Sequence, residues 1–205
     1  MKKLNLLAIS AAVAGALVSG AAAADVTANF GATSNYLWRG DTLSNEAAAI
    51  SGGADYSHAS GAYAGIWVSS EGFAGATGET DLYVGYAGEA GDISYDVGYV
   101  SYMYTQVDTA DFEEIYASVG YGPVSLFVAN DSDNDNSYVS VSAEHGMFSI
   151  TYGDYSFDAG GDYSHVDLGV ALTDELSLTY SSNDLDGPTG DGRFVVSYGL
   201  EFDVK

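Results

Sequence analysis

The sequence lacks cysteine altogether and has only five basic residues and two prolines among its 205 residues. Without cysteine, disulfides, Cys-ligated zinc, iron–sulfur clusters and a Cys nucleophile are excluded. Five Lys and Arg stand against 29 Asp and Glu, a formal net charge of −24. This balance argues against a nucleic-acid partner, because phosphate binding depends on clustered cations. The chain is nevertheless 47% hydrophobic and 13% aromatic, whereas disordered chains have low hydrophobicity.

Residues 1–24 have the features of a secretory signal peptide. Lys2 and Lys3 precede a mostly apolar run, and Ala22 and Ala24 fit an A-x-A cleavage site that would leave Asp25 first. The alternative is a membrane anchor, but the apolar run is shorter than the roughly 20 residues that span a bilayer. We therefore predict a signal peptide at 1–24 and a single domain at 25–205. That domain keeps three basic residues against 29 acidic ones, which is −26.

Helical signals are nearly absent after Asp25, and apolar and polar residues alternate with period two, as in β-strands. In the last segment, for example, Phe194, Val196 and Tyr198 share one face, and Val195, Ser197 and Gly199 share the other. The alternation predicts twelve strands, at roughly 28–39, 47–58, 62–70, 80–88, 92–104, 113–121, 124–130, 137–144, 147–155, 163–172, 176–183 and 194–204.

The predicted connections alternate between short and long. Short turns are expected at 59–61, 88–91, 122–123, 145–146 and 173–175, and longer polar loops at 40–46, 71–79, 105–112, 131–136, 156–162 and 184–192. This rhythm is typical of an up-and-down antiparallel meander with both chain ends on the short-turn side. Closing the meander into a barrel removes the edge strands that an open sheet would expose.

The composition of the two strand faces favours an outer-membrane barrel, in which the apolar face contacts lipid and the polar face lines the interior. The polar face is rich in Gly, Ser and Asp, and a strand of about ten residues spans a bilayer. Aromatic residues near the strand ends suit the membrane interfaces; they are Tyr36, Trp38, Trp67, Tyr86, Tyr104, Tyr121, Phe148, Tyr180 and Phe202. We predict an all-β, twelve-stranded transmembrane barrel, with a soluble barrel or sandwich as the alternative.

The alternation also predicts which charged residues line the lumen. They are Arg39, Asp55, Asp81, Asp96, Glu114, Glu144, Asp167, Arg193 and Glu201. One interpretation is a pore whose acidic lumen favours cations and admits ions or small polar solutes. The other is a closed structural or surface-interaction barrel, whose lumen is filled by tyrosines and Arg–carboxylate pairs. Twelve strands lie between the eight that side chains can fill and the sixteen that leave a channel.

Two other kinds of site are weaker hypotheses. The acidic loop at 130–136 resembles the start of a calcium loop, but counting from Asp131 the Gly and Glu of an EF-hand are replaced by Asn136 and Ser142. A solvated loop is favoured, with weak divalent-cation binding as the alternative. Hydrolytic catalysis would need a histidine, and the sequence has three: His58, His145 and His165, the last near Asp167. No nucleophile motif accompanies them. We predict neither enzymatic activity nor a cofactor.

The first half of the chain after residue 24 resembles a known family. The segment Ser34-Asn35-Tyr36-Leu37-Trp38-Arg39-Gly40, followed by Thr42-Leu43-Ser44, is similar to the start of TorF-type porins of proteobacteria. The similarity continues through residues 53–56, 61–67, 79–83, 95–99 and 113–116. It implies an outer-membrane β-barrel assigned as a porin. Because both chain ends lie on the short-turn side, we predict a barrel of a Gram-negative outer membrane with both termini periplasmic. The partners we expect are outer-membrane lipid and lipopolysaccharide, the barrel-assembly machinery, and small solutes or ions. No catalytic residues carry over.

Overall fold

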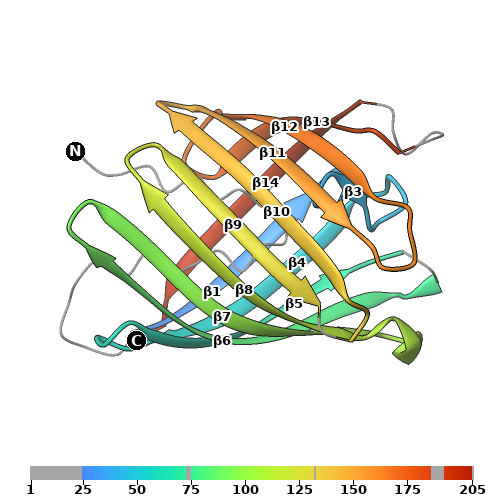
Figure 1. The fold of residues 1–205 in the computed structure, drawn as a ribbon. Coiled ribbons are helices and arrows are strands. Elements are labelled where there is room, and N and C mark those ends of the chain that lie inside the picture. Colours follow the sequence, from blue (N-terminus) through green and yellow to red (C-terminus); the bar gives the residue numbers. More distant parts are fainter. Residues whose placement is uncertain (1–24, 73–74, 132, 186–191, 205) are drawn as a thin grey trace.

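Twelve antiparallel strands close into a barrel in the computed structural model (Figure 1). The structure describes residues 25–72, 75–131, 133–185 and 192–204, so the predicted signal peptide lies outside the described residues. The wall strands are β1 (Asp25–Thr33), β4 (Ala49–Ser57), β5 (Ala62–Ser70), β6 (Gly78–Ala90), β7 (Ile93–Tyr104), β8 (Phe112–Tyr121), β9 (Val124–Asp131), β10 (Asn136–His145), β11 (Phe148–Ser156), β12 (Tyr163–Ala171), β13 (Leu176–Asn183) and β14 (Arg193–Asp203).

Each wall strand pairs with its neighbour in the sequence, and β1 pairs with β14 to close the ring. Short turns lie at one end of the barrel and long connections at the other, and both the described chain ends lie at the short-turn end (Figure 1). The predicted fold class, strand number and connection rhythm are confirmed. All predicted ranges but the first agree with the observed strands to within two residues.

The first predicted strand is wrong in its second half. β1 ends at Thr33, and the chain continues into a small hairpin of β2 (Leu37–Trp38) and β3 (Asp41–Thr42), which is separate from the wall. Arg39 and Gly40 have φ angles of 51° and 80°. Positive φ at both central residues is the mark of a tight hairpin turn. Period-two alternation is the same in a wall strand and in such a hairpin, so the pattern alone cannot separate them.

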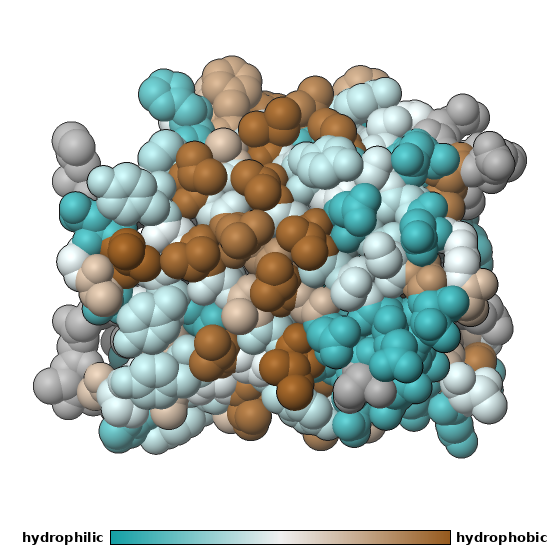
Figure 2. All heavy atoms as spheres, in the orientation of Figure 1, coloured by the Kyte–Doolittle hydropathy of each residue, from teal (hydrophilic) through white to brown (hydrophobic). Residues whose placement is uncertain are grey.

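Large apolar side chains cover the outside of the wall. Val84, Ile115 and Phe194 are 54%, 64% and 70% exposed. Figure 2 shows apolar residues over the strands and a dense hydrophilic region toward the long-connection end. An exposed apolar surface of this extent is foreign to soluble monomers, whereas a lipid-facing barrel requires it. Among the described residues, no helix is both long enough and apolar enough to cross a membrane.

The predicted interfacial aromatics divide between the two faces of the wall. Tyr86, Tyr121, Phe148 and Phe202 are exposed on the outside, and Tyr180 packs against Phe194. The interfacial interpretation is wrong for four others, which lie inside: Tyr36 and Tyr104 are buried, and Trp38 and Trp67 pack against the interior cluster. Their positions explain this, because Trp67 pairs with the inward Asp81 and Tyr104 has the parity of the inward Asp96.

Candidate functional site

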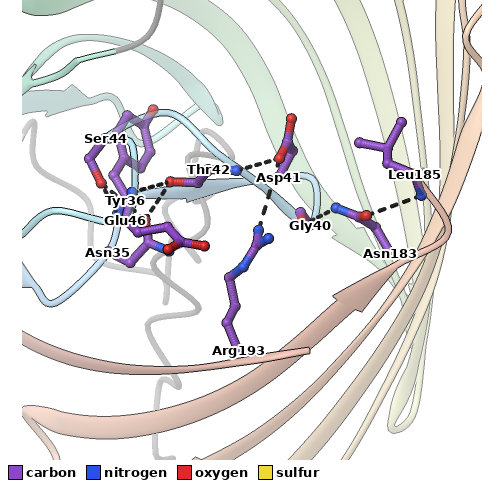
Figure 3. A network of polar contacts seen from close by, with 10 residues as sticks. All are labelled: Asn35, Tyr36, Gly40, Asp41, Thr42, Ser44, Glu46, Asn183, Leu185 and Arg193. Atoms are coloured by element: carbon purple, nitrogen blue, oxygen red, sulfur yellow. Dashed lines mark hydrogen bonds and ion pairs between the residues drawn. The ribbon is translucent and has the colours of Figure 1, made fainter. Parts of the chain in front are cut away.

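The connection between β1 and β4, residues 34–48, turns into the lumen, and we call it the inserted segment. Thr33 and Ala49, which flank it, are paired across the two strands, so the wall closes without its help. Tyr36, Leu37 and Leu43 in the segment are nevertheless buried at 2%, 7% and 6% exposure. Figure 3 shows the hairpin inside the ring of strands, close to Asn183 and Arg193 of the wall.

Internal hydrogen bonds brace the inserted segment. The Asn35 side-chain oxygen accepts from the hydroxyls of Thr42 and Ser44, at 2.6 and 3.0 Å. The Ser44 hydroxyl accepts from the Tyr36 backbone N–H at 2.8 Å, and the Thr42 hydroxyl accepts from that of Glu46 at 3.0 Å (Figure 3). These bonds give the segment a shape of its own, and further bonds tie its backbone to the wall: the Ser34 N–H donates to the Val196 carbonyl at 2.9 Å, and the Gly40 carbonyl accepts from the Asn183 amide at 2.8 Å.

Arg39 carries the strongest contact between the inserted segment and the wall. Its two terminal nitrogens donate to both carboxylate oxygens of Glu114 on β8, at 2.7 and 2.6 Å. Its guanidinium carbon lies 4.2 Å from the ring centre of Trp38, 4.3 Å from that of Tyr138 and 5.0 Å from that of Tyr155. Burial opposes the charged form, but Glu114 outweighs it, and the pKa of Arg39 is raised.

A second carboxylate, that of Glu79 at the start of β6, accepts hydrogen bonds from two tyrosines. The Tyr36 hydroxyl donates to it at 2.7 Å and the Tyr104 hydroxyl at 3.3 Å. Burial, with the nearby Glu79 charge, raises the pKa of Tyr36 well above its usual value. Asp81 lies two residues farther along the same face and is 5% exposed. The side of the lumen against Tyr36 thus gathers two carboxylates, and two phenols donate hydrogen bonds to one of them, Glu79.

Tyrosines also hold the acidic residues deeper in the barrel. The Tyr63 hydroxyl donates to Asp96 at 2.7 Å and contacts the Tyr116 hydroxyl. The Tyr83 hydroxyl donates to Asp55, which also accepts from the Asn29 amide at 3.2 Å.

Glycines on the neighbouring strands make room for these rings. A Cβ on Gly65 would collide with the Tyr83 ring, and one on Gly98 would collide with the Tyr116 ring. In both cases the glycine is paired directly with the tyrosine. The repeated Gly–Tyr pairing therefore packs broad aromatic rings flat across the inner wall.

His165 on β12 connects a phenol to a carboxylate. Its Nε2 lies 2.8 Å from the Tyr138 hydroxyl, and its Nδ1 lies 3.2 Å from Asp167 at ion-pair distance, without hydrogen-bond geometry. A Cβ at Gly40 of the inserted segment would collide with the imidazole. The partner of Nε2 is a phenol and not a serine hydroxyl, so His165 and Asp167 do not form a serine–histidine–acid arrangement here. His58, by contrast, lies in a short turn and contacts Ser60 at 2.9 Å.

The structure brings most of the predicted lumen residues to the inside. Asp55, Asp81, Asp96, Glu114 and Asp167 face inward on the wall, and Arg193 lies 3.9 Å from Asp41 of the inserted segment.

Three predicted positions differ from the main group. Glu144 and Glu201 lie near the short-turn ends of β10 and β14 and are exposed to solvent. Arg39 reaches the lumen, but from the inserted segment and not from the wall. The reason is the early end of β1, after which the side-chain alternation no longer reports the wall.

Sequence reasoning missed Glu79 and the phenols around it. The loop predicted at 71–79 includes Glu79, although its i, i+2 relation to Asp81 marks it as inward once the strand is extended.

Hydrogen bonds within the acidic loop after β9 account for its run of polar residues. Asp131 accepts from the backbone N–H groups of Asp133 and Asn134, and from the side-chain amides of Asn134 and Asn136. The described residues contain no group of three or more His, Asp or Glu arranged to hold a metal ion.

The barrel has the fold of outer-membrane porins. It is similar to the KdgM porin with a TM-score of 0.54 at 7% identity, covering 87% of this chain and 99% of that chain. A second structure, the KdgM porin in complex with disordered oligogalacturonate, gives a TM-score of 0.51 at 8% identity, with 89% and 100% covered. Outer membrane phospholipase A from Escherichia coli is more distant, with a TM-score of 0.46 at 10% identity and 87% and 89% covered.

Residues 18–183 match the model of a family described as "Bacterial protein of unknown function (Gcw_chp)". The chain therefore belongs to the Gcw_chp family. None of the curated proteins matches the sequence. The resemblance to TorF-type porins stays a prediction, and the structural similarities, at such low identity, establish the fold alone.

Proposed function

We propose that the protein is a narrow porin of a Gram-negative outer membrane, through which ions and small polar solutes diffuse passively, cations in preference to anions. The observation that carries this proposal is a closed barrel with an apolar exterior and a lumen lined by hydrogen-bonding and acidic side chains. A polar interior of this kind suits aqueous solutes.

The charge of the lumen supports the preference for cations. Asp55, Asp81, Asp96 and Asp167 face inward, while the charge of Arg39 is matched by Glu114 at hydrogen-bond distance. The carboxylates therefore exceed the cations among the described lumen residues. Carboxylates around a pore attract cations and repel anions. The surrounding lipid has a low dielectric, and it strengthens this effect relative to bulk water.

The inserted segment supports a narrow passage. It crosses from the rim next to β1 and β4 to side chains on β8, β10 and β11, which lie on the far side of the ring. Nearer the short turns, the inward positions include small hydroxyl residues such as Ser94, Ser118 and Thr179, together with the buried Tyr63 and Asp96. We therefore expect the inserted segment, in the long-connection half of the lumen, to set the size limit.

The burial of polar side chains around the inserted segment supports a second candidate, a closed barrel that acts through its acidic loops. Glu79, Glu114 and His165 are each only 2% exposed, so the long-connection half of the lumen is densely packed. In this case the inserted segment is a permanent plug and not a constriction. Conductance separates the two candidates directly.

The route to the membrane is part of the proposal. Residues 1–24 would direct export and be removed after Ala24, and the barrel-assembly machinery would insert the domain with both termini periplasmic. The exposed apolar wall would contact outer-membrane lipid. The acidic long connections would face lipopolysaccharide, where divalent cations would bridge the like charges.

Planar-bilayer recording of the purified protein in a salt gradient tests the proposal. We expect discrete current steps and a reversal potential of the sign set by cations. Replacing Asp55, Asp81, Asp96 and Asp167 by Asn keeps their shape and should move the reversal potential toward zero. Asp174→Asn, in an exposed short turn, is the matched control and should leave it unchanged. Steps with an unaltered reversal potential in the lumen variant would disprove cation selection, and the absence of steps would favour the closed barrel.

A further inference from the structure

We propose that Glu114, together with the rings of Tyr138 and Tyr155, forms a binding site for guanidinium-bearing cations. In this structure Arg39 of the chain itself occupies the site, and a guanidinium-bearing solute would compete with it. The proposal goes beyond the pore function and rests on it only in that a solute must enter the lumen to reach the site.

The wall supplies the carboxylate and two of the three aromatic rings. Glu114 lies on β8, Tyr138 on β10 and Tyr155 on β11, whereas the third ring, Trp38 at 4.2 Å, belongs to the inserted segment. Each carboxylate oxygen of Glu114 accepts from one terminal nitrogen of the guanidinium, and the Tyr102 hydroxyl donates to Glu114 at 3.3 Å. A carboxylate facing a planar fork, with aromatic rings 4.3 and 5.0 Å away, is an arrangement that recognises guanidinium better than ammonium.

The wall does not need Arg39 in order to stay closed. Thr33 and Ala49 are paired, so both ends of the inserted segment meet at the rim and the barrel stays closed wherever the segment lies. Asn35, Thr42 and Ser44 hold the segment together internally. The wall therefore stays intact when the Arg39 side chain leaves Glu114, while Tyr36 and Asp41 keep the segment in contact with the wall.

Replacing Arg39 at Glu114 by another guanidinium costs less free energy than leaving Glu114 without a partner. Glu114 is 2% exposed, and a buried carboxylate left without its partner is strongly disfavoured. A guanidinium-bearing solute replaces both hydrogen bonds and the charge of Arg39 in one step. Sodium offers charge without the planar fork, and urea offers a similar plane without charge. The site should therefore bind guanidinium more tightly than either sodium or urea.

Thermal unfolding of the Arg39→Ala barrel in detergent, titrated with millimolar guanidinium chloride, tests the site without any need for conduction. Guanidinium normally destabilises proteins, so a saturable rise in Tm would report binding. We expect this rise at about a tenfold lower concentration than with tetramethylammonium, the factor that one charge-assisted hydrogen bond supplies. Urea and sodium chloride should give no rise.

Two variants locate the effect. Adding Glu114→Gln to Arg39→Ala should abolish the rise, because the charged acceptor is gone. Arg193→Ala is the matched control, since it also removes a lumen arginine but leaves Glu114 paired with Arg39; it should show no rise. If Arg39→Ala does not fold, Arg39→Lys takes the same titration, because a lysine cannot form the fork.

The outcomes separate the site from the pore. A rise with guanidinium that requires Glu114 supports the site, whether or not the protein conducts. No rise, an equal rise with urea, or a rise that survives Glu114→Gln would overturn it. In wild-type bilayers guanidinium should increase the frequency of open steps relative to sodium at equal ionic strength. Steps that guanidinium leaves unchanged would overturn the competition with Arg39, whereas a complete lack of steps would instead contradict the pore.

Discussion

At the scale of residues, the lumen is organised by phenols that hold carboxylates and by glycines that make room for the phenols. Tyr63 donates to Asp96, Tyr83 donates to Asp55, and Tyr36 donates to Glu79. A phenol keeps its proton at neutral pH and can always donate, so it satisfies a carboxylate without adding a positive charge. The lumen can therefore bury acidic groups and remain short of cations.

The Gly–Tyr pairs lead to a stability prediction. Gly65→Ala would place a methyl group where the Tyr83 ring lies, and we expect the free energy of unfolding to fall by about 1–3 kcal/mol, as for overpacking elsewhere. Gly169→Ala is the matched control, because its new methyl would meet only the Ser149 hydroxyl, which can rotate away. Urea unfolding of both variants in lipid vesicles measures the difference, and equal losses would contradict the packing role of Gly65.

At the scale of elements, eleven of the twelve wall strands could be predicted from alternation, because a strand between lipid and a polar lumen must alternate. The inserted segment could not. Its hairpin alternates in the same way as a strand, and its burial comes from partners distant in the sequence, such as Glu114 for Arg39 and Asn183 for Gly40. The wrong prediction for the aromatic residues has the same cause. Trp67 and Tyr104 lie near strand ends, as interfacial residues do, and only the strand register shows that they face the lumen.

The outward faces of the strands lead to a second prediction. Val84, 54% exposed near the middle of β6, should contact lipid near the bilayer centre. Val84→Arg should lower the free energy of unfolding of the barrel in vesicles by about 2–4 kcal/mol, the cost of a cation at that depth. Asp92→Arg, in the exposed turn between β6 and β7, introduces the same side chain outside the membrane and should cost little. A harmless Val84→Arg would indicate a barrel that is not embedded in lipid.

At the scale of the whole molecule, the fold, the outward apolar wall and the acidic interior follow from composition and alternation. The pairing of Arg39 with Glu114, which places a segment across the lumen, does not. The barrel and the inserted segment are separable in principle, because Thr33 and Ala49 already pair at the rim. In the proposed function, the wall forms the pore and the inserted segment limits its width.

The most direct test is to compare single-channel conductance of the mature wild type with that of a barrel in which residues 34–48 are replaced by a two-residue Asn-Gly turn. Such a turn suits paired antiparallel strands, so the shortened barrel should still fold and show heat-modifiable migration. We expect cation-selective steps in both proteins and larger steps in the shortened one. Steps of equal size would contradict the role of the inserted segment as the constriction, and the absence of steps from the folded, shortened barrel would contradict the pore itself.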